Sequence, residues 1–178
     1  MARRSMALMG ATGRVGPKGR VGHLSTGTRG ATDATQTAAL WCGLPADSKV
    51  LVDSAPFIYL LQDHAEFAPR FVGLFEASRA QQLHVALSAV TLAEVLVGPF
   101  KAGQDALARR YERALRAFEV VPVTAEIAVQ AARLRSRYGL KLPDAIQLAT
   151  ALDVGASALV THDRDFGKVR GLRIVHGA

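Results

Sequence analysis

Four acidic residues stand at positions where a chain of alternating strands and helices would gather them. These are Asp53, Glu94, Asp144 and Asp163. Asp53 and Asp163 each follow an apolar run that is typical of a buried strand, whereas Glu94 and Asp144 fall on predicted helices. Ligands of open parallel sheets bind beyond the carboxyl ends of the strands, so such acids converge although they are far apart in sequence. Crowded carboxylates repel one another unless a hard cation neutralises them, and the pattern therefore predicts a Mg²⁺ or Mn²⁺ site. Asp165 competes with Asp163 for the fourth place.

Each acid also has a structural interpretation. Asp144, at a helix start, can satisfy free N–H groups and the helix dipole without any catalytic role. Asp53 can be a polar strand end, but we expect Ser54 to cap the following helix, which leaves the Asp53 carboxylate free to face the cleft. An ionised Glu94 among apolar neighbours costs desolvation energy unless a cation, a donor or a solvent-filled cleft receives it. The four acids together are more informative than any one of them.

Apolar runs and turn signals predict the elements that would position these acids. Five strands are expected, at 49–53, 83–87, 118–123, 158–161 and 172–175, with helices between them. Gly98 and Pro99 are expected to end the Glu94 helix, and Gly139 is expected to cap a later helix in a left-handed conformation. Strands alternating with helices indicate a mainly parallel sheet covered on both faces, a three-layer α/β/α domain.

Length and composition favour one soluble globular domain. The chain has 178 residues, of which 49% are hydrophobic and 21% charged. No apolar stretch approaches the roughly 20 residues that span a bilayer, so no membrane association is expected. The single cysteine, Cys42, excludes an internal disulfide and leaves no metal-binding Cys pair, which favours the reducing cytoplasm.

The N-terminal segment 1–48 differs from the rest. It is rich in Gly, Arg, Ser and Thr without periodicity, so we predict a disordered extension, or a mis-assigned start codon, before a folded domain at 49–178. This segment holds six Arg or Lys and two Asp, which is more than half of the net charge of +7.

A basic stripe is predicted on one helix of the folded part. Arg109, Arg113 and Arg116 fall on one helical face, with Arg110 beside them. This stripe is either a solvated helix face or a surface that contacts phosphates.

Four segments carry motifs that point to one family. They are Leu51-Val52-Asp53-Ser54, Thr91-Leu92-Ala93-Glu94-Val95-Leu96-Val97-Gly98-Pro99, Gly139-Leu140-Lys141-Leu142-Pro143-Asp144-Ala145-Ile146-Gln147-Leu148-Ala149 and Leu159-Val160-Thr161-His162-Asp163-Arg164-Asp165-Phe166. Together, and in this order, they resemble the PIN-domain nucleases, above all the VapC toxins of bacterial toxin–antitoxin pairs. The resemblance spans about residues 49 to 176.

The resemblance implies a small α/β/α domain, usually a homodimer, that cleaves RNA endonucleolytically to 3′-hydroxyl and 5′-phosphate ends. It implies Mg²⁺ or Mn²⁺ held by the acids at positions 53, 94, 144 and 163, with Ser54 and Thr161 in supporting roles. It also implies a VapB-like antitoxin whose segment enters the cleft and often places an Arg against the acids. His162 stands where these proteins often have Asn, which puts no ligand in doubt.

Other chemistries explain the pattern less well. A phosphatase would want an Asp-x-Asp pair, and Ala55 stands where the second acid belongs; a receiver would want an early acid pair. His162 could serve as a general acid, but metal-assisted hydrolysis needs none. No nucleophile elbow supports a covalent triad. A non-catalytic RNA-binding or partner-binding module with the same fold remains the alternative.

Overall fold

A five-stranded parallel sheet forms the centre of the molecule, in the order β3-β2-β1-β4-β5. The structure, a computed structural model, describes residues 41–177. The strands are β1 (Ser48–Val52), β2 (Leu83–Ser88), β3 (Glu119–Val121), β4 (Ala158–Val160) and β5 (Arg173–Val175). β1 is the middle strand, with Val50 opposite Val85 of β2 and Ala158 of β4. The predicted parallel sheet is confirmed, and each strand lies within its predicted range or a residue from it.

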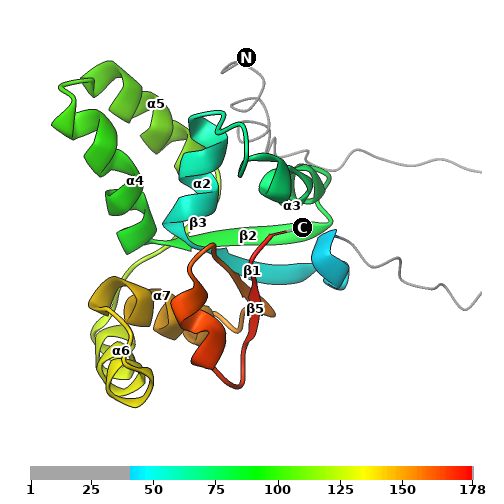
Figure 1. Ribbon diagram of the computed structural model, residues 1–178, viewed down its shortest axis with the longest axis vertical. Coiled ribbons are helices and arrows are strands. Elements are labelled where there is room, and N and C mark those ends of the chain that lie inside the picture. The colour runs from blue at the N-terminus through cyan, green and yellow to red at the C-terminus, as the bar shows by residue number, and fades with distance from the viewer. Residues whose placement is uncertain (1–40, 178) are drawn as a thin grey trace, which may run out of the picture.

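Helices cover both faces of the sheet, which gives the predicted three layers (Figure 1). The helices are α2 (Ser54–Leu61), α3 (Pro69–Arg79), α4 (Ala89–Lys101), α5 (Asp105–Leu115), α6 (Ala125–Tyr138) and α7 (Leu142–Asp153). The first four lie on one side of the sheet, and α6 and α7 lie on the other (Figure 1). A short 3₁₀ helix, Arg164–Lys168, joins the second side.

Alternation along the strands divides the core between the two sides. On β1, Val50 and Val52 pack against the α2–α5 side and Leu51 packs against the α6–α7 side, because successive strand residues point to opposite faces. Fully buried Phe57 and Phe75 fill the first layer, with ring centroids 5.3 Å apart. Apolar residues on both faces of β1 explain why its sequence reads as a continuous apolar run.

The described structure begins before the predicted domain boundary at residue 49. Trp41–Gly43 forms a 3₁₀ turn, Leu44 is buried in the core, and the Trp41 ring lies 6.3 Å from that of Phe71. Arg173 donates a hydrogen bond to the Gly43 carbonyl at 3.0 Å. The remainder of the predicted extension, residues 1–40, lies outside the described residues. Within the described part, no helix combines the length and apolar character that a membrane span requires.

Two predicted helix ends have different outcomes. Gly139 adopts φ 70° at the end of α6, which confirms the left-handed cap. The prediction that Gly98 and Pro99 end the Glu94 helix is wrong, because α4 continues through Pro99 to Lys101. A proline so close to the helix end removes only one backbone hydrogen bond, and Pro99 is buried on the core side of the helix. The turn after α4 comes instead at Gly103, with φ 66°.

Candidate active site

Asp53 lies at the carboxyl end of the central strand and is almost completely buried. Its backbone is extended and makes it the N-cap of α2, with Oδ1 accepting a hydrogen bond from Ser54 N at 2.7 Å. The prediction that Ser54 caps this helix is therefore wrong, because the helix begins one residue earlier than expected. Asp53 both caps the helix and faces the other acids.

Thr161 fixes the second oxygen of this carboxylate. Its hydroxyl donates to Asp53 Oδ2 at 2.8 Å and accepts a hydrogen bond from Asp163 N at 3.0 Å. The Asp53 N–H donates to the Val160 carbonyl at 2.9 Å, which extends the β1–β4 pairing to the site. Thr161 is fully buried, so it holds Asp53 in one orientation.

Glu94, Asp144 and Asp163 lie close enough to Asp53 for the acids to affect one another's pKa. Burial raises the pKa of the Glu94 carboxyl, and the charges of Asp53 and Asp144 raise it further, while a Ser54 hydrogen bond lowers it. Burial likewise raises the pKa of Asp53, against hydrogen bonds from Thr161 and Ser54. The four-acid cluster thus occupies one site at the carboxyl ends of β1 and β4, with Glu94 from α4 and Asp144 from α7.

Asp144 does not act as a helix cap. It lies in the first turn of α7, whose N-cap, Lys141, makes no side-chain capping bond. Asp144 Oδ2 is buried and has no hydrogen-bond partner among the described residues. A buried carboxylate oxygen without a donor is costly, so this atom is suited to an electrophile supplied from outside the protein.

The structure also bears on the choice between Asp163 and Asp165. Asp163 is half-buried and raises the pKa of both Asp53 and Asp144, whereas Asp165 is exposed and raises that of Asp144. Asp163 Oδ1 accepts the Asp165 N–H at 2.8 Å, which begins the 3₁₀ turn. This arrangement favours Asp163 as the fourth acid.

The carboxylates are close enough to repel one another, yet in residues 41–177 no three His, Cys, Asp or Glu side chains are grouped tightly enough to hold a metal ion by themselves. Mg²⁺ does not need such a group, since it keeps several waters and takes one or two carboxylates directly. The donor set consists of oxygens, and Asp144 Oδ2 lacks a partner. These residues therefore fit a hydrated hard cation better than a protein-only cage.

A buried polar network, not foreseen from the sequence, positions the two helical acids. Gln147 Oε1 accepts from Ser88 Oγ at 2.8 Å, and Gln147 Nε2 donates to Thr91 Oγ1 at 2.6 Å. All three side chains are fully buried. Thr91 lies one helical turn before Glu94, and Gln147 lies one turn after Asp144, so the network fixes α4 against α7. In the sequence, the signal for this network is a polar residue one helical turn from each helical acid: Thr91 from Glu94 and Gln147 from Asp144.

We expect Gln147→Leu to destabilise the protein by about 2 kcal/mol, because it leaves the buried Ser88 and Thr91 hydroxyls without their amide partner. Urea denaturation followed by circular dichroism measures the change. Gln130→Leu, on half-exposed α6 surface, is the matched control and should change stability little. Equal stability of the Gln147 variant and the wild type would contradict a structural role for this network.

The raised pKa of Asp144 predicts a particular pH dependence. Burial is the main cause, the charges of Asp53, Asp163 and Asp165 add to it, and Lys141 opposes it. The folded protein then binds this proton more tightly than the unfolded chain, so the stability contributed by Asp144 is lost as pH rises above about 4. Asn cannot titrate. In EDTA, Asp144→Asn should therefore gain stability relative to wild type between pH 4 and 7, measured by urea denaturation at each pH; a constant difference would refute this.

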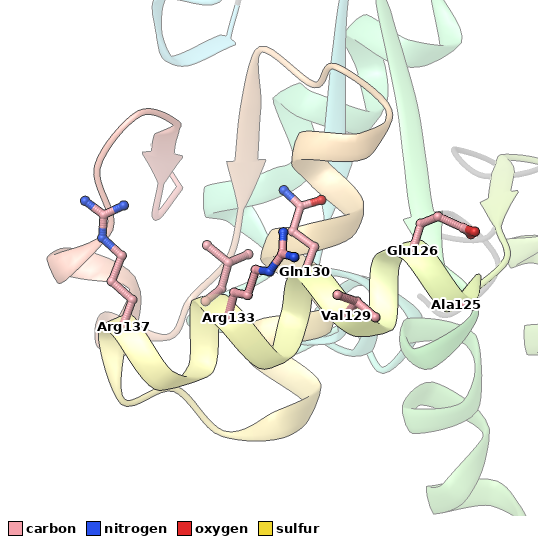
Figure 2. A pocket seen from close by; sticks show the side chains of 7 residues that line it. Ala125, Glu126, Val129, Gln130, Arg133 and Arg137 are labelled. Atoms are coloured by element: carbon pink, nitrogen blue, oxygen red, sulfur yellow. The ribbon is translucent and has the colours of Figure 1, made fainter.

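Two other surfaces lie apart from the four-acid cluster. The arginines of the predicted stripe on α5 are exposed, and Arg116 pairs with Glu112 at 2.8 Å. A cavity of about 590 Å³ lies along α6, where Figure 2 shows Glu126, Gln130, Arg133 and Arg137 projecting from the helix. None of the four acids lines this cavity.

Comparison with known proteins identifies relatives of this arrangement. The family model described as PIN domain matches residues 50–172. No curated protein sequence matches the chain. A toxin–antitoxin complex from Klebsiella pneumoniae contains a chain that is 33% identical, with a TM-score of 0.56, and the match covers 71% of this chain and 95% of that one.

Two further solved structures share the fold at lower identity. VapBC2 from Rickettsia felis, bound to a DNA fragment from its promoter, is 18% identical with a TM-score of 0.59, covering 71% of this chain and 96% of that one. Mycobacterium tuberculosis VapC20, described as a sarcin–ricin loop cleaving toxin, is 21% identical with a TM-score of 0.52, covering 70% and 98%.

Proposed function

This chain belongs to the PIN domain family, and on that premise we propose that it is a metal-dependent endoribonuclease, the toxin of a VapBC-like toxin–antitoxin pair. One observation supports the proposal most strongly. The charge of the buried Asp53 raises the pKa of Glu94 and Asp144, and the charge of Asp163 raises the pKa of Asp53 and Asp144. Such a site lowers the stability of the metal-free protein. A functional role accounts for keeping these acids together, whereas core packing gives no reason for it.

The proposed cofactor is Mg²⁺ or Mn²⁺, held by Asp53 and Asp144 as the main ligands, with Glu94 and Asp163 completing the acidic pocket. When bound, the ion would activate water and offset the charge that develops on the phosphodiester. Thr161 and Ser54 hold Asp53 in place through their hydrogen bonds. The Ser88–Thr91–Gln147 network keeps α4 and α7 at the spacing that the acids require.

The proposed partners follow from the relatives. The similar chain from Klebsiella pneumoniae comes from a toxin–antitoxin complex, which supports a VapB-like antitoxin for this protein. A basic side chain of the antitoxin, placed against the four-acid cluster, would satisfy the unpartnered Asp144 oxygen in place of a cation. We further propose a homodimer that acts on RNA in the cytoplasm.

A cleavage assay on total bacterial RNA tests the proposed activity. The antitoxin-free protein should yield discrete fragments with Mg²⁺ or Mn²⁺ and none in excess EDTA. Ends carrying 5′-phosphate and 3′-hydroxyl groups would match the proposed hydrolysis. A folded protein that binds RNA without cleaving it would support the non-catalytic binding module instead.

A further inference from the structure

A cluster of four rings lies at the edge of the acidic site. Its members are Tyr59 from α2, His64 and Phe67 from the following loop, and His162 after β4. Tyr59 and Phe67 each contact the other three rings. The His162 ring lies 4.6 Å from Phe67 and 5.4 Å from Tyr59, and His64 stacks on Phe67 at 4.7 Å. Tyr59 Oη and His162 Nδ1 are hydrogen-bonded at 2.6 Å. We call these four residues the ring patch.

The ring patch is joined directly to the four-acid cluster. His162 lies between Thr161, which holds Asp53, and Asp163, whose N–H bonds to Thr161. The ring patch therefore borders the four-acid cluster through the segment Thr161–Asp163. No residue of the ring patch has a part in the proposed hydrolysis, so its position needs another explanation.

The ring patch differs from the aromatic core of the same layer. Phe57, Phe71 and Phe75 are fully buried, whereas Tyr59 and Phe67 are half-buried. Within the ring patch, His162 is also half-buried and His64 is exposed. A half-buried ring keeps part of its surface accessible to a ligand, which a fully buried core phenylalanine does not.

A cation completes this surface. The Arg70 guanidinium carbon lies 5.6 Å from the Phe67 ring centroid, and the Arg70 side chain is exposed. Aromatic side chains and planar guanidinium groups are the surfaces on which unpaired bases stack, and the cation favours the adjoining phosphate. A peptide segment has no comparable need for stacked rings with a planar cation.

We propose that the ring patch, together with Arg70, is a subsite that stacks an unpaired base of the RNA beside the phosphodiester to be cleaved. The inference rests on the proposed function, since it takes RNA as the substrate. It restricts that substrate to RNA with an unstacked nucleotide next to the cut, because a base in a continuous duplex has no free face. Phe67 anchors the stack that the base would extend, since the exposed His64 ring stacks on Phe67 and Arg70 lies over the same ring.

Binding of a fluorescently labelled single-stranded RNA oligonucleotide tests this subsite. The experiment uses the full chain with Asp144→Asn, which keeps the RNA intact, and measures fluorescence anisotropy. Adding Phe67→Leu should weaken binding roughly tenfold to a hundredfold, as expected for the loss of one stacked base. Phe67→Tyr retains a ring and should bind within about twofold of the parent. Phe100→Leu, which removes an exposed ring on α4, should have no effect.

A second series separates stacking from a merely structural role. Oligonucleotides with one abasic nucleotide are compared, position by position, on the parent and on Phe67→Leu. One abasic position should weaken binding to the parent and have no further effect on the variant, because both changes remove the same contact. If Phe67→Leu does not fold, the same comparison is made with Arg70→Lys, which changes an exposed side chain.

The outcomes distinguish the subsite from the activity. If the parent and every variant bind intact and abasic oligonucleotides equally well, the proposed subsite is wrong. The ring patch would then be assigned to binding of an antitoxin segment. Uniformly weaker binding of all oligonucleotides by Phe67→Leu would overturn it too, since that indicates a structural role. Failure of the proposed function appears elsewhere, as absence of metal-dependent cleavage by the wild type in the total-RNA assay.

Discussion

Asp53→Asn abolishes RNA cleavage and leaves the fold intact: this is the largest effect we expect from a single substitution. Loss of even an outer-shell partner of a metal ligand costs about 10- to 100-fold in affinity or activity, so neutralising a main ligand should cost at least that much. The amide keeps an oxygen for the Ser54 N–H, and its NH₂ can donate to the Thr161 hydroxyl. Fragment yield from total RNA measures the loss.

Stability provides the control for this variant. Removing one charge from a buried cluster of acids relieves their repulsion. The free energy of unfolding of metal-free Asp53→Asn should therefore lie within about 1 kcal/mol of the wild-type value or slightly exceed it. Asp153→Asn, an exposed acid at the end of α7, is the matched control and should cleave normally. Full-rate cleavage by Asp53→Asn would end the nuclease proposal, and unfolding would make Asp53 structural.

The second large effect is a loss of response to metal. Mg²⁺ or Mn²⁺ should raise the melting temperature of the wild type, because a ligand that binds only the folded state stabilises it by mass action. In Asp144→Asn this rise and the cleavage should both disappear, since the side chain with the unpartnered buried oxygen no longer carries a charge. Differential scanning fluorimetry across a metal titration measures the response.

The control for the metal titration is the same titration in excess EDTA. There the melting temperature of each protein, wild type or Asp144→Asn, should not change as metal is added. Asp153→Asn should respond to Mg²⁺ as the wild type does. An unchanged metal response in Asp144→Asn would mean that the ion binds elsewhere, and the proposed ligand set would then be wrong.

The strand ends could be predicted from the sequence because local signals determine them. Apolar runs mark β1 and β4, and the carboxyl ends of parallel strands meet at one edge, which brings Asp53 close to Thr161. Gly139 was likewise predictable, since a left-handed residue at a helix end favours glycine. These features depend on near neighbours in the chain, which a single sequence reveals.

Other features depend on contacts that a single sequence does not show. Which residue caps α2 depends on whether the backbone at Asp53 or at Ser54 leaves the strand first, a difference of one residue. The network around Gln147 joins segments 56 and 59 positions apart. Tyr59 and His162 are 103 positions apart and carry no motif that pairs them. Only the packing of three layers brings such residues together.

The hydrogen bond between Thr161 and Asp53 spans 108 positions of the chain. Asp53 lies on the central strand of the sheet, which gains its β4 neighbour only after β2, β3 and the helices α2 to α7 have been translated. The Asp53 carboxylate is therefore held in place only once β4 and Thr161 have left the ribosome. On the proposed function, a toxin whose β4 has not yet been translated lacks a formed site and does not cleave its own messenger.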